Sequence, residues 1–189
     1  YDILDHKLTE PQIRIYDTYC DAWEIIHQNL DAALEATNIV DPMSGKTLNG
    51  QAKGAALSRF ESTKQRFFGQ VLTAMKLPSL IPAIEADLAN GDAAVVQLVS
   101  TAEAMLGRRL AELSPDERAA LEIELSPREY VIDYLTNAFP TRAMEIYADE
   151  EGFLRSRPAV DAQGNPAISS EAIAARDRLI EQLCALPAV

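Results

Sequence analysis

The chain has 189 residues, 48% of them hydrophobic and 24% charged, with eight glycines and ten prolines. This composition is typical of a globular protein and excludes collagen-like and disordered chains. The net charge of −12 repels nucleic acids and acidic lipids on average, so a phosphate site would require a local basic patch. No apolar run approaches the ~20 residues that a membrane-spanning helix needs, and we expect no membrane partner.

Catalytic and metal-binding motifs are scarce. Two cysteines, Cys20 and Cys184, and two histidines, His6 and His27, show no CxxC or HxxxH spacing and are accompanied by no GxSxG motif. We therefore predict neither a metal site nor a catalytic residue. Both cysteines are interpreted as reduced, which predicts a cytoplasmic protein. The chain begins at Tyr1, inside sequence that has the patterns of ordered structure, and we expect an internal fragment of a larger protein.

The first half of the chain has the pattern of long helices. Apolar residues recur every three or four positions over 11–37, and Thr9 begins a capping box in front of them. After a loop that contains glycine and proline, a second helix is predicted over 51–76. Pro78 is expected to end it, and a shorter helix is predicted over 79–89.

The middle of the chain is predicted to contain a strand and two helices. Residues 93–99 are apolar and mostly β-branched or small, which indicates a short buried strand. Two segments further on each place Ser at the N-cap, Pro next and Glu at the third helical position. They predict helices over 115–124 and 127–138.

The last third of the chain changes its period. Alternation over 144–148 predicts a β-hairpin that turns at 149–152. A final helix is predicted to begin after Ser169 or Ser170. The predicted fold class is therefore mainly α, a helical bundle-like array with one short buried strand and a β-hairpin.

Two short motifs resemble parts of an ATPase but lack the required context. Gly-Lys-Thr at 45–47 would need a first P-loop glycine where Val40 stands, and the segment before it is predicted to be helical. Asp-Glu at 149–150 would need a continuously apolar strand, which Glu145 interrupts. We interpret the first motif as a turn between helices and the second as the tip of a hairpin.

Basic residues are concentrated in one window. Residues 46–76 hold six basic residues and a single acid, a net charge of +5 that leaves −17 for the remainder. Arg59 and Arg66 are seven residues apart and point within ~20° of each other around a helix, whereas Lys64 falls among the apolar positions. The second helix is thus predicted to face something anionic, either phosphates or an acidic partner. The alternative is that it packs on acidic helices of the same chain.

A second candidate site for phosphate is the end of the predicted strand. Gln97 lies in the strand, and Ser100 and Thr101 would start the following helix. Hydroxyl groups and free N–H groups at a helix start often hold a phosphate. An ordinary helix cap explains the same residues.

These two features together resemble a known family. Gln-Arg-Phe-Phe at 65–68, followed by a Val-Val segment that ends in Ser-Thr-Ala-Glu-Ala at 100–104, looks like the strawberry notch family. Its members are large helicase-like proteins of superfamily two, and the bacterial and phage ones are often fused to or associated with a methyltransferase. Residues 8–17 resemble the segment that leaves the first RecA-like lobe, and residues 156–166 resemble the stretch before the conserved second-lobe region.

The resemblance implies a division of the chain. Residues 1–91 would be a helical connector after the first RecA-like lobe, and residues 92–189 would begin the second lobe with a helical and hairpin insertion. The motifs for ATP and Mg²⁺ would lie outside this chain, so the parent protein would bind them and this fragment would hold no cofactor. The family usually has Gly where Ala102 stands and His where Lys64 stands, which weakens the expected phosphate contact.

The sequence therefore predicts a non-catalytic fragment of a nucleic-acid-dependent, helicase-like NTPase that couples two motor lobes. Its expected partners are the flanking lobes and, through the parent protein, DNA or RNA. The alternative is a helical protein–protein interaction module with an acidic surface. The candidate nucleic-acid contacts are Arg59, Lys64, Arg66, Gln97, Ser100 and Thr101.

Overall fold

The computed structural model describes residues 3–97, 107, 111, 114 and 127–186. The predicted fold class, mainly α with a β-hairpin, is confirmed. The elements are α1 (Glu10–Ala36), α2 (Gly50–Ala89), α5 (Pro127–Asn137), β1 (Met144–Ala148), β2 (Leu154–Pro158) and α6 (Ser170–Leu183).

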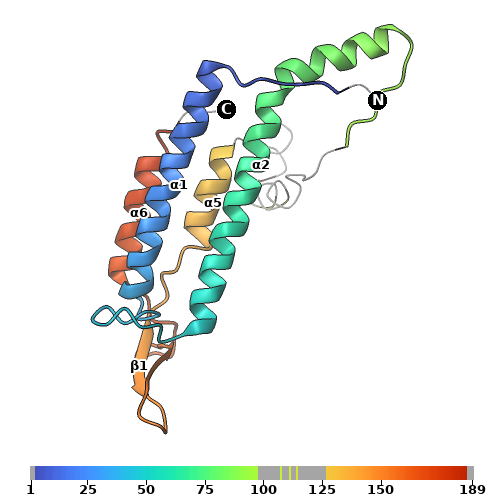
Figure 1. Ribbon diagram of the computed structural model, residues 1–189. Helices are drawn as coiled ribbons and strands as arrows, with labels where there is room; N and C mark the ends of the chain where they lie inside the picture. Colours follow the sequence, from blue (N-terminus) through green and yellow to red (C-terminus); the bar gives the residue numbers. More distant parts are fainter. Residues whose placement is uncertain (1–2, 98–106, 108–110, 112–113, 115–126, 187–189) are drawn as a thin grey trace.

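The helices form an elongated bundle in which α1 packs on α6 and α2, and α5 packs on α2 and α6 (Figure 1). Aromatic side chains from three helices meet in its core. The ring centroid of Trp23 lies 5.5 Å from those of Phe60 and Phe67 and 6.0 Å from that of Tyr134. Leu179 of α6 belongs to the same core. Burial of one such side chain contributes about 2 kcal/mol, so this cluster holds the bundle together.

Side-chain caps fix where three helices begin. The Gln12 backbone N–H donates to the Thr9 hydroxyl, and the Thr9 N–H donates to the Gln12 side chain at 2.9 Å. The predicted capping box is therefore confirmed. Asn49 and Ser169 each accept a hydrogen bond from the backbone N–H three residues further on, so Ser169 caps the last helix.

Helix α2 is longer than the sequence predicted. It continues through Pro78 and Pro82 to Ala89, so the prediction that Pro78 ends it is wrong. A proline removes one backbone donor and crowds the preceding turn, which bends a helix without having to end it. Figure 1 shows α2 bending where it leaves the bundle, and we name its projecting part, residues 77–89, the α2 arm.

The N-terminal segment lies against the base of the α2 arm. His6 Nδ1 is 2.7 Å from Ser79 Oγ, and Gln12 Nε2 donates to the Met75 backbone oxygen at 2.8 Å. The second bond satisfies a carbonyl group beside the turn that Pro78 disturbs. These contacts tie the start of the arm to the N-terminal end of α1.

Hydrogen bonds attach the hairpin to the connection between α1 and α2. Its strands pair antiparallel, which confirms the predicted hairpin, and the register places Ile146 opposite Ser156. The Asn38 side chain donates to the Met144 backbone oxygen at 3.0 Å, and the Asn49 side chain donates to the Ser156 backbone oxygen at 3.0 Å. Asn38 has φ of 59°, a left-handed conformation that asparagine tolerates just after a helix.

Residues 93–97, which follow the α2 arm, have no regular secondary structure and are all exposed. The prediction of a buried strand is therefore wrong for these residues, while Leu98 and Val99 lie outside the described residues. A buried strand needs neighbouring strands for its N–H and C=O groups, and the described part of the chain supplies none here. The helix predicted over 127–138 is confirmed as α5; the one predicted over 115–124 lies outside the described residues.

One hydrophobic core joins residues on both sides of the expected boundary between 91 and 92, because α5 and α6 pack on α1 and α2.

By length and composition, α2 could also cross a membrane. It contains an 18-residue window with a mean hydropathy of 1.3, of which 17% is buried. Helices of soluble cores pass the same test, so one such helix is weak evidence. The expected absence of a membrane partner stays a prediction.

Candidate nucleic-acid interface

Arg59 and Arg66 lie on the side of α2 next to α5, and both are exposed. Burial raises the pKa of Tyr130 on α5, and the positive charge of Arg66 partly offsets that rise. Arg59 lines a hollow beside the segment that follows α5. Within the described residues, neither guanidinium forms an ion pair. Among the described residues, no acidic side chain therefore neutralises either arginine.

Lys64 lies on the other side of α2, beside α1. Its ammonium nitrogen is 2.8 Å from Glu61 Oε1 and 5.0 Å from the ring centroid of Phe60. It lines a hollow of about 320 Å³ between α1 and α2 that has an aromatic floor. Since each residue turns a helix by ~100°, Lys64 is directed away from Arg59 and Arg66. The three candidates do not form one site.

The remaining candidates come from the predicted strand end. Gln97 is exposed in the segment after the α2 arm that has no regular secondary structure. Ser100 and Thr101 lie outside the described residues. The phosphate site that these three residues would form stays a prediction.

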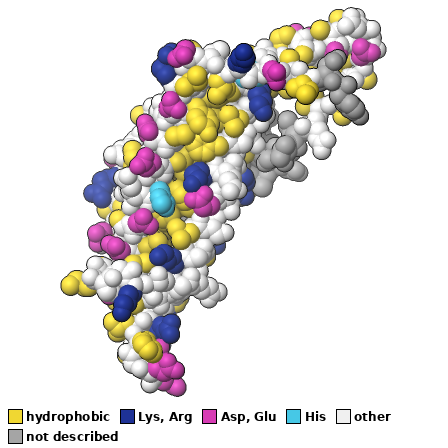
Figure 2. All heavy atoms as spheres, in the orientation of Figure 1, with side chains coloured by type: hydrophobic (Ala, Val, Ile, Leu, Met, Phe, Trp, Pro, Cys, Tyr) yellow, Lys and Arg dark blue, Asp and Glu magenta, His cyan; other side chains and the backbone are white. Residues whose placement is uncertain are grey.

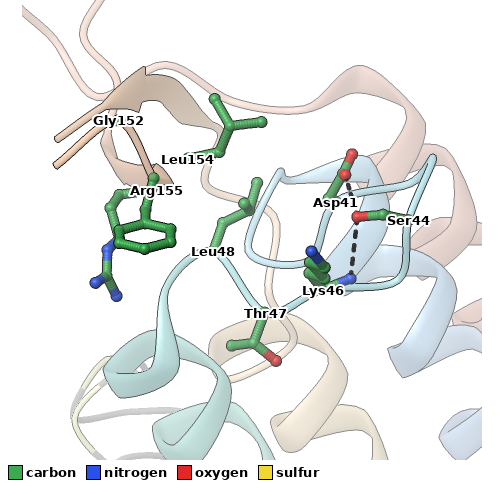
Figure 3. A pocket seen from close by; sticks show the side chains of 9 residues that line it. Asp41, Ser44, Lys46, Thr47, Leu48, Gly152, Leu154 and Arg155 are labelled. Carbon is green, nitrogen blue, oxygen red and sulfur yellow. Dashed lines mark hydrogen bonds between the residues drawn. The ribbon is translucent and has the colours of Figure 1, made fainter.

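The fold brings the two ATPase-like motifs to the same end of the molecule. The α1–α2 connection and the hairpin tip enclose a cleft of about 540 Å³ (Figure 3). Lys46 and Thr47 line one side and Arg155 lines the other, with Leu48 and Leu154 between them. Asp41 and Ser44 also line the cleft, so its lining combines apolar, polar and oppositely charged side chains.

The Gly-Lys-Thr segment forms a turn between helices, as predicted. The Gly45 N–H donates to the Asp41 backbone oxygen at 2.8 Å, and the Lys46 N–H donates to Ser44 Oγ at 3.4 Å. In a P-loop such N–H groups would point at phosphates, whereas here they are used inside the turn. The Ser44 hydroxyl and the Met43 N–H donate to the Asp41 carboxylate and lower its pKa.

Asp149 stabilises the turn of the hairpin, in agreement with the prediction of a hairpin tip. The Phe153 N–H donates to its carboxylate at 2.8 Å and Arg155 Nε does so at 3.1 Å. These hydrogen bonds lower the pKa of Asp149, and the bond from the Phe153 N–H contributes most.

Across the described residues no group of three or more His, Cys, Asp or Glu gathers in a metal-binding arrangement. Cys20 and Cys184 are free thiols.

The structure adds one residue that the sequence did not single out. Arg142 lies just before β1 and lines the same hollow as Arg59. The basic window ends at Lys76, far from Arg142 in the chain, so no local pattern marks it. The two arginines line the same hollow because α5 packs on α2 and the hairpin follows directly after α5.

No protein-family model, curated protein or solved structure matches this chain. The family resemblance therefore rests on the sequence motifs alone. Two kinds of surface remain for a functional argument: the exposed arginines beside α5 and the exposed apolar side chains at the far end of α2.

Proposed function

We propose that this chain is a non-catalytic helical module of a strawberry-notch-like, nucleic-acid-dependent NTPase, and that it couples the two motor lobes of that protein. The parent protein would bind ATP, Mg²⁺ and DNA or RNA, and this chain would contact the flanking RecA-like lobes. The sequence motifs at 65–68 and 100–104 support the family. The exposed apolar end of α2 supports the coupling role.

An exposed apolar surface extends from the α2 arm into residues 93–97. Leu77, Ile81 and Leu88 are 41%, 47% and 55% exposed, and Val95 is 93% exposed. Figure 2 shows hydrophobic side chains gathered over this end of the molecule and along the upper part of α1 and α2. Burial of apolar surface contributes ~25 cal/mol per Å². A neighbouring lobe that buried these side chains would therefore bind the arm, and through α2 it would be connected to the bundle.

The segment after the α2 arm fits the same role. Val95 and Val96 are apolar and β-branched, yet residues 93–97 have no regular secondary structure and are solvent-exposed. In the proposed function they pair with strands of the second lobe, which would satisfy their backbone N–H and C=O groups. The α2 arm would then transmit movement between that lobe and the bundle.

The test uses the full-length protein from which this chain is expected to derive. Ile81→Gln combined with Leu88→Gln should leave basal NTP hydrolysis unchanged and reduce its stimulation by nucleic acid several-fold, because the lobe no longer docks on the arm. Ile25→Gln is the matched control, since Ile25 is 42% exposed on α1, away from the arm. Unchanged stimulation in the double variant would reject the coupling role.

A second candidate function is supported by the outer face of α1. This face is acidic and exposed, and its acids are Glu10, Asp17, Asp21, Glu24, Asp31 and Glu35. Burial raises the pKa of the Cys20 thiol, and the charges of Asp17 and Asp21 raise it further. Such a face suits a basic partner helix. Salt-sensitive binding of a lysine-rich helical peptide, lost in Asp17→Asn/Asp21→Asn, would favour the interaction module.

A further inference from the structure

A hollow lies between α2 and the segment that joins α5 to β1. Its volume is about 260 Å³. Arg59 of α2 and Arg142, which lies just before β1, both line it, and so do Asn137 and Thr141. Its other lining residues are all apolar.

The charge of this hollow is unusual for the chain. Acidic residues outnumber basic ones by 29 to 17, yet none of the residues that line the hollow is acidic. In the described part of the chain, neither Arg59 nor Arg142 forms an ion pair. The nearby Glu145 carboxylate is bound by Arg157. Two arginines from different elements, neither paired with an acid among the described residues, thus line one hollow whose lining includes no acidic residue.

The chemistry of the lining suits a phosphate group. A guanidinium presents a planar fork of N–H donors that matches phosphate oxygens in a bidentate manner. The Thr141 hydroxyl can add a further donor. The Asn137 amide nitrogen donates one of its two hydrogens to Asp133 Oδ1 at 3.0 Å, and the two arginines bring the charged donors.

We propose that Arg59 and Arg142 form a phosphate-binding subsite that holds a single phosphate group between them. The source of the phosphate rests on the proposed function: it belongs to the backbone of a bound nucleic-acid strand. Arg66 lies two helical turns from Arg59, about 10 Å along α2. The strand therefore leaves the subsite along the side of α2 next to α5.

The test measures binding of a labelled single-stranded oligonucleotide to the whole chain by fluorescence anisotropy over a range of salt concentrations. Arg59→Gln and Arg142→Gln should each weaken binding about fivefold to tenfold. Each should also reduce the slope of log K against log salt concentration by about 0.7, the loss of one phosphate contact. The double variant should lose no more slope than either single variant, because the two arginines share one phosphate. Additive slope losses would overturn the subsite.

Two further variants separate this inference from the proposed function. Arg176→Gln removes the same charge from α6, where Arg176 pairs with Asp177, and should leave the slope unchanged. If Arg66→Gln and Arg59→Gln weaken binding and Arg142→Gln does not, the nucleic-acid role stands and the subsite is wrong.

A chain that binds no oligonucleotide would instead contradict the nucleic-acid role. The subsite is then tested with inorganic phosphate alone, followed by the NMR shifts of the Thr141 and Arg142 amides. Shifts that are lost in Arg59→Gln support the subsite for free phosphate. The absence of any shift in the unmodified chain overturns it.

Discussion

Phe67 packs against three other aromatic rings in the core. Its ring centroid lies 4.8 Å from that of Tyr19, 5.5 Å from that of Trp23 and 5.1 Å from that of Phe68. Its side chain is fully buried. Removal of such a ring loses its transfer free energy and leaves a cavity between α1 and α2.

We expect Phe67→Ala to lower the free energy of unfolding by about 3–5 kcal/mol, measured by urea denaturation with far-ultraviolet circular dichroism as the probe. Phe153→Ala is the matched control, because Phe153 is 58% exposed at the hairpin tip. It should change stability by no more than about 0.5 kcal/mol. Similar losses in both variants would contradict this description of the core.

The candidate site shows which residue-level features can be read from a sequence. Helical geometry alone correctly grouped Arg59 with Arg66, since residues seven apart share a face. The surroundings of Lys64 depend on α1, and those of Arg142 on α5 and the hairpin. The surroundings of both residues are made by elements that are distant in the chain, and a local sequence pattern carries no information about such contacts.

The helix and hairpin boundaries were predicted best where a side chain satisfies the backbone locally. Thr9 and Ser169 mark their helix starts because each hydroxyl accepts a backbone N–H within one turn. The hairpin was predicted because its alternating pattern matches the pleat. The prediction for residues 93–97 failed because a strand, unlike a helix, takes its hydrogen bonds from other segments.

The α2 arm was mispredicted for a different reason. Pro78 and Pro82 are four residues apart, so Pro82 cannot donate the hydrogen bond that the Pro78 carbonyl would otherwise accept. In a buried helix that lost bond would be costly, whereas Pro78 and Pro82 are exposed and water can hydrate the carbonyl. The helix therefore continues, but with a weakened turn.

We expect backbone amides of the arm to exchange with deuterium faster than those of 56–75, which lie in the packed part of α2. Pro82→Ala should slow exchange in the arm, since a proline inside a helix costs about 3 kcal/mol relative to alanine. Global stability should not change, because the arm lies outside the core. Equal protection along the whole of α2 in the unmodified chain would show that the prolines do not weaken it.

At the scale of the whole molecule, two surfaces respond to salt in opposite directions. Phosphate contacts of Arg59 and Arg66 weaken as salt rises, because fewer counterions are released on binding. Contacts between exposed apolar side chains strengthen, because salt screens the mutual repulsion of chains that each carry a charge of −12. The direction of the salt effect therefore separates an association through the apolar arm from one through charged side chains.

The isolated chain should self-associate through its uncovered α2 arm. Sedimentation velocity should show a weight-average mass that rises with protein concentration, and more steeply at higher salt. Ile81→Gln/Leu88→Gln should suppress this rise, because it removes exposed apolar surface from the arm. Arg59→Gln/Arg66→Gln should leave it in place, since these side chains lie beside α5 and away from the arm. If the arginine variant abolished association and the arm variant did not, the apolar arm would not be the docking surface.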